Sequence, residues 1–191
     1  MARVRKSDFA FDADLIGFAA PQLLLARDAS WSYWDAGTEP GAGWTEPGFN
    51  DSDWAVGAAP LGYGKTSVAT PLRVPSDRSG AIATTYFRTV FTVLDARTIH
   101  GLLFRAWRAN GAVVYLNGKE VARWNLLEGP VGADEPATKS ARESEGLGFV
   151  EVPLAPALLV SGSNELAVEL HPTRRATLPV RMELSLVGTT G

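Results

Sequence analysis

Apolar and polar residues alternate along much of the second half of the chain, the pattern of a β-strand with one buried and one solvent-facing side. The alternation is strictest over Val180–Leu186, where we expect a single strand. Thr84–Leu94 is rich in β-branched and aromatic residues, and Phe87, Phe91 and Val93 fall on one side of it. Further candidate strands of the same character are 102–107, 113–116, 120–124 and 166–170.

Turn residues separate these candidate strands. Asn117-Gly118 lies between two of them, and because both residues tolerate positive φ, a tight type I′ hairpin is expected. The turn residues Ser161–Asn164 precede another strand. The best helical candidate, 133–142, is mostly polar, and the long polar stretch Asn125–Gly148 is expected to be a surface excursion. Many short strands separated by Gly and Pro turns predict an all-β fold, a two-sheet sandwich.

Four of the six tryptophans lie between residues 31 and 54, among Gly, Pro, Asp and Ser. No single period places them all on one face, so we expect turns to position them. This texture and the motifs after it resemble the galactose-binding-like jelly-roll modules found as accessory domains of bacterial proteins and, more distantly, the sugar-binding domain of family 2 glycosidases. The motifs are Trp31–Asp35, Gly43–Trp54, Ala59–Gly64, Thr85–Phe91, Asn110–Val121, Arg123–Asn125, Gly129-Pro130 and Leu158–His171.

The resemblance covers about residues 22–188 and implies a two-sheet jelly-roll β-sandwich of about eight core strands over 22–191, preceded by an N-terminal arm, 1–21. It also implies a carbohydrate-binding-module type of function, in which the domain binds and does not catalyse. The chain departs from the modules at two places. Ala109-Asn110-Gly111 stands where they usually have Asp-Asp-Gly, and Pro172 follows His171 where Gln is common.

The length, net charge and cysteine count limit the number of domains and the kinds of partner that this chain can have. The 191 residues are enough for one core and few for two, so we expect one domain. With a net charge of −3 there is no basic excess to neutralise phosphates, and nucleic acid is not an expected partner. The chain has no cysteine and so forms neither a disulfide nor a thiolate metal site, and the cysteine count leaves its compartment open.

The N-terminus has the charge of a signal peptide over Met1–Lys6, but Asp8, Asp12 and Asp14 interrupt the apolar stretch that such a peptide needs next. The apolar run Leu15–Ala26 is too short to cross a bilayer, so we predict neither a cleaved leader nor a membrane span. The segment is then a disordered leader or an arm that docks on a partner, and its apolar content favours docking. The docking residues would be Phe9, Phe11, Leu15, Ile16 and Phe18.

Patterns that would support catalysis fail on context, and no enzyme is expected. Ala59–Thr66 satisfies a relaxed phosphate-loop pattern, but prolines come after it where a helix is needed. His100 and His171 have no further ligands at metal spacing, and the chain has no Gly-x-Ser-x-Gly elbow for a nucleophile. Two carboxylate pairs fall in expected surface turns, namely Asp51/Asp53 and Glu143/Glu145.

Two sets of residues are candidates for binding. Asp51 and Asp53 are candidate calcium ligands, since hard cations accept carboxylate oxygens from loops, and related jelly rolls often hold a structural calcium near such turns. A sugar site needs an aromatic face that stacks on a pyranose and amides that bond its hydroxyls. The residues that offer these groups are Trp107, Trp124, Asn110 and Asn125. The competing interpretation buries both tryptophans in the core.

The sequence leaves two functions of different classes. The first is a non-catalytic binding module that recognises glycan or a surface. The second is a structural or assembly protein, such as a decoration or attachment subunit of a phage virion or another large particle, docked by its N-terminal arm on a larger assembly or on a second copy of itself. A module that begins at its own Met, with neither a leader nor a catalytic partner domain, favours the second, and would place the chain in a virion or cell-surface assembly.

Overall fold

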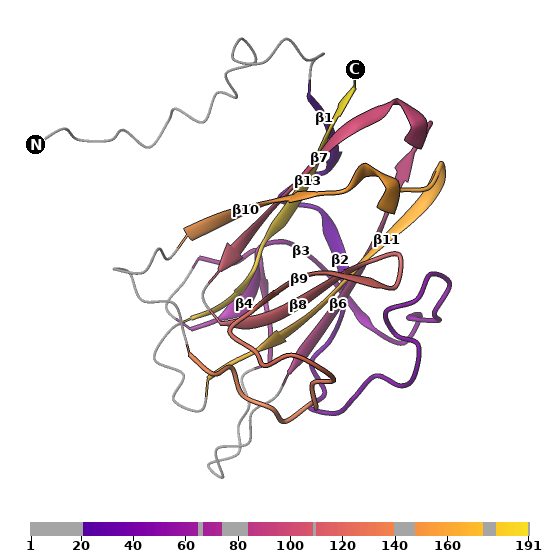
Figure 1. Cartoon of the computed structure of the whole chain (residues 1–191). Helices are drawn as coiled ribbons and strands as arrows, with labels where there is room; N and C mark the ends of the chain where they lie inside the picture. Colours follow the sequence, from indigo (N-terminus) through magenta and orange to yellow (C-terminus); the bar gives the residue numbers. More distant parts are fainter. Residues whose placement is uncertain are drawn as a thin grey trace, which may run out of the picture.

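A computed structural model describes residues 21–64, 67–73, 84–108, 110–139, 148–173 and 179–190. They form an all-β sandwich built on two larger sheets and one small sheet (Figure 1). The only helical segments among the described residues are two short 3₁₀ turns, η2 (Ala96–Thr98) and η4 (Pro156–Leu158). The predicted fold class is therefore confirmed.

The sheets combine strands that are far apart in the sequence. The four-stranded sheet has the order β1 (Pro21–Leu25), β13 (Leu184–Thr190), β7 (Ile99–Arg108) and β10 (Gly148–Leu154). The six-stranded sheet has the order β3 (Ala55–Ala58), β2 (Ser30–Trp34), β6 (Thr85–Val93), β11 (Gly162–His171), β8 (Gly111–Leu116) and β9 (Lys119–Trp124). The small sheet has the order β12 (Val180–Met182), β4 (Leu61–Tyr63) and β5 (Thr70–Pro71), and only its β4–β5 pair is parallel.

One hydrophobic core lies between the two larger sheets. Trp31 and Phe87 from the six-stranded sheet and Phe104 and Leu186 from the four-stranded sheet are all 0% exposed. Strand β6 buries the side predicted from its alternation, with Phe91 and Val93 following Phe87 into the core. Burial of this apolar surface is the main stabilising contribution to the fold.

The hairpin between β8 and β9 has the predicted type I′ turn, because Asn117 has φ 51° and Gly118 has φ 78°. The Asn117 side chain also joins the hairpin to the start of β11. Its Nδ2 donates to the Leu158 carbonyl and to Asn164 Oδ1, each at 2.9 Å, and its Oδ1 accepts from the amide of Glu165 at 2.9 Å. Asn117 thus meets both a backbone and a hydrogen-bonding requirement.

We expect Asn117→Ala to lower the free energy of unfolding by about 2–4 kcal/mol, from three lost hydrogen bonds and a side chain forced into positive φ. Asn117→Gly removes the hydrogen bonds but keeps the backbone conformation, so its loss should be about 1 kcal/mol smaller. Urea unfolding of the two variants measures both values. Equal losses would show that the turn conformation carries no cost, and a negligible loss in both would contradict the anchoring role of Asn117.

The segment 35–54 covers part of the outer face of the six-stranded sheet, around Tyr86 and Arg88 of β6 and Tyr115 of β8, so the tryptophan-rich opening is not simply a chain of surface turns. The Trp44 ring lies edge-on to Tyr86 of β6 at 4.9 Å and to Tyr115 of β8 at 5.6 Å. Arg88 of β6, only 2% exposed, donates to the carbonyls of Trp44 and Glu46. Part of the opening is also regular: β2 contains two of its tryptophans, contrary to the expectation of turns alone.

The expected single strand 180–186 is wrong. The chain leaves the small sheet after β12 and enters the four-stranded sheet at β13, and Glu183 lies between them. Glu183 is 4% exposed, and its carboxylate accepts from Nε of Arg27 and of Arg181, each at 2.8 Å. Because Ser185 is also buried, the alternating polar residues do not form a solvent-facing side. The helical candidate 133–142 is wrong over its described part, 133–139, which forms turns and coil.

Candidate functional site

A pocket of about 480 Å³ opens where the end of β9 meets the loop after it. We call it the β9 pocket; it is lined by Glu120, Arg123, Trp124, Asn125, Leu126, Glu128 and Gly129. Strand β9 ends at Trp124, and Asn125, with φ 56°, turns the chain away from the sheet. The Asn125 carbonyl then accepts from the amide of Thr138 at 2.8 Å, which closes the loop back on itself.

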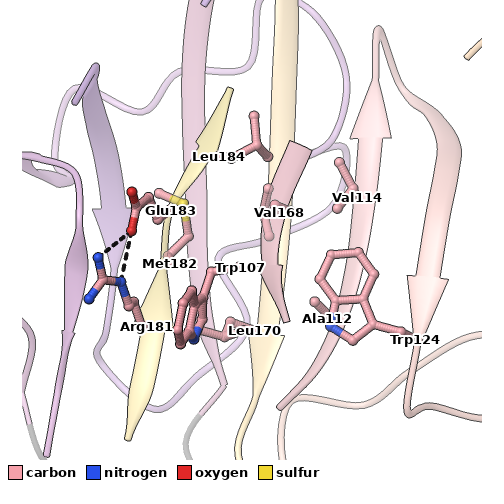
Figure 2. A pocket seen from close by; sticks show the side chains of 11 residues that line it. Trp107, Ala112, Val114, Trp124, Val168, Leu170, Arg181, Met182, Glu183 and Leu184 are labelled. Atoms are coloured by element: carbon pink, nitrogen blue, oxygen red, sulfur yellow. Dashed lines mark hydrogen bonds and ion pairs between the residues drawn. The ribbon is translucent and has the colours of Figure 1, made fainter. Parts of the chain in front are cut away.

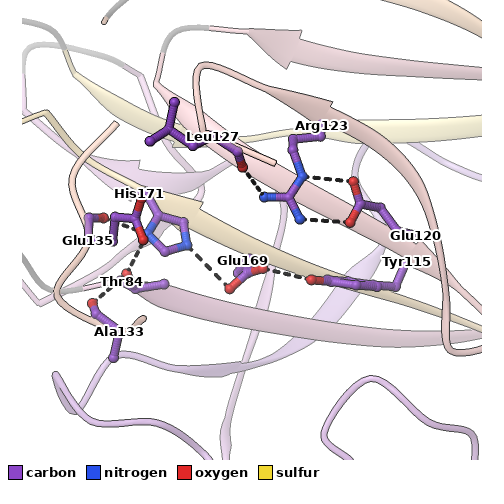
Figure 3. Close-up of polar contacts among 9 residues, drawn as sticks. All are labelled: Thr84, Tyr115, Glu120, Arg123, Leu127, Ala133, Glu135, Glu169 and His171. Atoms are coloured by element: carbon purple, nitrogen blue, oxygen red, sulfur yellow. Dashed lines mark hydrogen bonds and ion pairs between the residues drawn. The ribbon is translucent and has the colours of Figure 1, made fainter. Parts of the chain in front are cut away.

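An ion pair forms one side of the β9 pocket (Figure 3). Arg123 donates through Nε to Glu120 Oε1 at 2.8 Å and through Nη2 to Glu120 Oε2 at 2.7 Å, while its Nη1 donates to the Leu127 carbonyl at 2.7 Å. The hydrogen bond with Arg123 lowers the pKa of Glu120, and the same bond raises the pKa of Arg123. Both groups are therefore charged, and their geometry is fixed before any ligand arrives.

A β-bulge explains why Glu120 and Arg123 lie on the same face of β9. Glu120 and Arg123 are three positions apart, which places them on opposite faces of a regular strand. In β9, however, Ala122 pairs with Val114 and Glu120 pairs with Tyr115, so Val121 is an extra residue without its own partner. The bulge reverses the alternation and brings Glu120 and Arg123 together. Sequence reasoning missed both residues because it assumed an unbroken period of two.

Trp124 separates the β9 pocket from a second, interior pocket between the two larger sheets. Figure 2 shows Trp107 and Trp124 among the side chains that line this interior pocket. Its volume of about 10 Å³ leaves room for about one water molecule. Within the described part of the chain, no hydrogen-bond partner is found for Nε1 of either tryptophan, and both atoms are buried. Trp107 itself packs edge-on against Phe149 at 5.6 Å, and the Arg181 guanidinium lies 5.0 Å above its ring.

The four residues predicted for a sugar site lie at one end of the sandwich but have different environments. Trp124 and Asn125 line the β9 pocket. Asn110 is 1% exposed, and its side-chain Nδ2 donates to the Pro179 carbonyl at 3.1 Å. The backbone carbonyl of Asn110 accepts from Asn125 Nδ2 at 3.0 Å. Asn110 therefore positions Asn125 from inside the fold, and Trp107 lines only the interior pocket.

The candidate calcium ligands are not brought together with further ligands. Asp51 Oδ2 lies 3.4 Å from Arg88 Nε, and Asp53 is exposed. Over the described ranges, no group of three or more His, Asp or Glu side chains is close enough to hold a metal ion. Asp51 is thus part of an ion pair with a buried arginine.

A buried polar network lies beside the β9 pocket and links the loop after β9 to the six-stranded sheet (Figure 3). His171, 0% exposed, contacts the Glu135 carbonyl at 2.8 Å and Thr84 Oγ1 at 2.9 Å through Nδ1, and Glu169 Oε2 at 3.3 Å through Nε2. Tyr115 donates its hydroxyl to Glu169 Oε1 at 2.8 Å. Burial, and next the negative charge of Glu169, raise the pKa of Tyr115, so it stays a donor.

The geometry of this network places its protons. The carbonyl of Glu135 only accepts, so Nδ1 of His171 carries a proton and donates to it. With Thr84 Oγ1 donating to the Ala133 carbonyl at 2.6 Å, every member is engaged in holding the fold. His171 is thus buried inside this network, whereas His100 is exposed.

The glycine-rich stretch 59–66 is not a phosphate loop in its described part. Leu61–Tyr63 is strand β4, paired on both sides by β12 and β5. A Cβ on Gly62 would lie 2.1 Å from the Val180 carbonyl oxygen, so this glycine is needed for close strand packing. Lys65 and Thr66 lie outside the described residues. In those same described parts of the chain, no helix is long and apolar enough to cross a membrane.

No family model matches the sequence, and no curated protein matches it significantly. Its fold is similar to part of several solved enzymes. A calcium-binding mutant of β-glucuronidase 2 from Bacteroides uniformis aligns at a TM-score of 0.56 and 17% identity, over 88% of this chain and 18% of that one. A β-glucuronidase from Ruminococcus gnavus, in complex with C6-substituted uronic isofagomine, aligns at a TM-score of 0.52 and 13% identity, over 91% of this chain and 30% of that one.

A further β-glucuronidase, from glycoside hydrolase family 2, aligns at a TM-score of 0.54 and 13% identity, over 92% of this chain and 18% of that one. The chain therefore spans less than a third of the length of each of these three enzymes. At such low identity the likeness concerns the fold. The chain is thus an all-β sandwich whose fold is similar to that of a small part of family 2 β-glucuronidases.

Proposed function

We propose that this chain is a non-catalytic binding module of the galactose-binding-like jelly-roll class and that it recognises glycan at the β9 pocket. One observation carries the proposal: a pocket of about 480 Å³ places part of an indole beside a carboxylate, a guanidinium and an amide. A pyranose offers an apolar face for the indole and hydroxyls for the polar groups. The fold similarity to a small part of sugar-cleaving enzymes supports a role beside catalysis.

The rigidity of the pocket also supports binding. Arg123 is held by three hydrogen bonds, to Glu120 and to the Leu127 carbonyl, and Asn125 is held by the buried Asn110. Side chains that are ordered before a ligand arrives lose little entropy when it binds. Further along, the same loop is tied to the sheet where His171 contacts the Glu135 carbonyl and the Pro172 carbonyl accepts from the amide of Ala137.

A glycan array with matched variants tests the proposal. We expect the wild-type protein to be retained on at least one glycan, and Arg123→Ala to weaken that binding about tenfold or more, because a charge-assisted hydrogen bond contributes about 1.5–3 kcal/mol. Lys119→Ala is the control, since Lys119 is an exposed neighbour on β9 that does not line the pocket. A blank array at high protein concentration, or equal effects of the two substitutions, would contradict the proposal.

A second function, docking of the N-terminal arm in an assembly, is favoured by the strand that follows the arm. Leu23 of β1 is 61% exposed and pairs with Val187 of β13 on the four-stranded sheet. The expected docking residues Phe9, Phe11, Leu15, Ile16 and Phe18 lie outside the described residues, so their role stays a proposal.

Deletion of residues 2–20 should leave a folded and soluble module, because the described core begins at β1. If the arm mediates assembly, sedimentation of the deletion variant should show a monomer where the full chain associates with itself or with a partner particle. Unfolding of the deletion variant would make the arm part of the core. Unchanged association would place the interface on the sandwich itself.

A further inference from the structure

The charges around the β9 pocket indicate which sugars it can accept. Three charged side chains line it, the carboxylates of Glu120 and Glu128 and the guanidinium of Arg123, so two negative charges face one positive charge. The Glu120 side chain is 41% exposed and Glu128 is exposed, whereas the Arg123 side chain is 14% exposed. The negative groups are therefore the more accessible ones.

Arg123 and Glu120 neutralise each other inside the protein, so the net charge of the lining is the negative charge of Glu128. Glu120 takes both Nε and Nη2 in a bidentate pair, and the Leu127 carbonyl takes Nη1. Three of the five N–H groups of the guanidinium are thus used. The hydrogen bond with Glu120 and the negative charge of Glu120 raise the pKa of Arg123, and the charge of buried Glu169 adds to the rise. An anionic ligand would have to compete with Glu120 for this guanidinium.

We propose that the β9 pocket selects saccharides that bring hydrogen-bond donors, binds protonated amino sugars best and disfavours uronic acids. This inference rests on the proposed glycan-binding function and adds the ligand class to it. An ammonium group carries three donors and a positive charge, which suits accessible carboxylates. The carboxylate of a uronic acid brings only acceptors and a like charge toward Glu128. The β-glucuronidase from Ruminococcus gnavus that is similar in fold was solved with a uronic ligand, which is the class of ligand that the β9 pocket is proposed to disfavour.

Titration calorimetry with three oligosaccharides of equal length tests this proposal on the full chain. The probes are a chitosan trisaccharide with free amines, its fully N-acetylated counterpart and trigalacturonate, at a pH where the amines are protonated and the carboxylates ionised. We expect the amine to bind about threefold to fivefold more tightly than the neutral sugar, and the uronate to bind more weakly than the neutral sugar by a similar factor, the scale of partly exposed ion pairs.

Two substitutions separate the charges. Glu128→Gln should reduce the preference for the amine, and Glu120→Gln should improve uronate binding because it releases Arg123. Glu151→Gln, an exposed carboxylate on β10 outside the pocket, should leave the order unchanged. If the uronate binds as well as the amine, or if Glu151→Gln removes the amine preference as Glu128→Gln does, the ligand class is wrong while glycan binding stands. If no probe binds, and the array is blank as well, the proposed function fails with it.

Discussion

Replacement of Arg88 by methionine should lower the free energy of unfolding by about 3–5 kcal/mol, the usual cost of breaking a buried ion pair. Arg88 is 2% exposed, pairs with Glu165, which is 5% exposed, and also donates to Asp51 and to two carbonyls of the covering segment 35–54. Methionine fills much of the same volume, so the loss reports the charge and the hydrogen bonds. Urea unfolding at neutral pH measures it.

The pH dependence of this loss identifies its cause. Burial raises the pKa of Glu165, and the charge of Arg88 opposes that rise, so Arg88→Met should raise the pKa further. A carboxyl whose pKa is higher in the folded than in the unfolded state binds more protons when folded, so stability falls as pH rises between the two values. The loss of unfolding free energy in Arg88→Met should therefore be smallest in acid, where Glu165 is protonated.

A double variant provides the control. Arg88→Met combined with Glu165→Gln removes the buried charge together with its partner, and it should recover part of the stability at neutral pH and lose the pH dependence. If the single variant is as stable as the wild type, the pair is not buried in solution. A loss that is constant from acid to neutral pH would show that the carbonyl contacts, and not Glu165, account for it.

Glu169→Leu should lower the free energy of unfolding by about 3 kcal/mol, because it leaves the buried His171 and the half-buried Tyr115 without their shared acceptor. The effect should be concentrated in the loop after β9, since His171 also holds the Glu135 carbonyl and Pro172 accepts from the amide of Ala137 at 3.1 Å. Hydrogen exchange of the Ala137 amide should become faster than the loss of global stability alone explains.

Glu120→Leu is the matched control for this prediction, because it removes a carboxylate from the same sheet whose side chain is 41% exposed. An exposed ion pair contributes about 0–1 kcal/mol, so this variant should unfold close to the wild type. Similar losses in the two variants would contradict the difference in burial. Unchanged exchange at Ala137 in Glu169→Leu would show that the network does not hold the loop.

Local patterns predicted much of the fold. The turn at Asn117-Gly118 and the alternation of β6 depend on neighbouring residues, and both are found as expected. The division of 180–186 between two sheets depends on Glu183, which meets Arg27, a residue 156 positions away. Such a contact leaves no local signal. For the same reason no local signal shows that Arg88 of β6 is buried by its contacts with the segment 35–54.

The candidate site was predicted only in part. Trp124 and Asn125 do line the β9 pocket, since a strand end followed by a turn is a place where side chains become accessible. Asn110 had the right residue type but a buried position, because its neighbour Pro179 comes from a distant segment. Glu120 and Arg123 escaped notice because a bulge is defined by two strands together and cannot be seen in one.

Chemical-shift mapping with a bound glycan shows whether ligand binds at the β9 pocket. On titration of ¹⁵N-labelled protein, we expect the largest changes at the amides of 120–129 and at the Trp124 indole, while β1 and β10 stay unchanged. Changes concentrated on the four-stranded sheet, or no change with any glycan from the array, would contradict glycan binding at the β9 pocket.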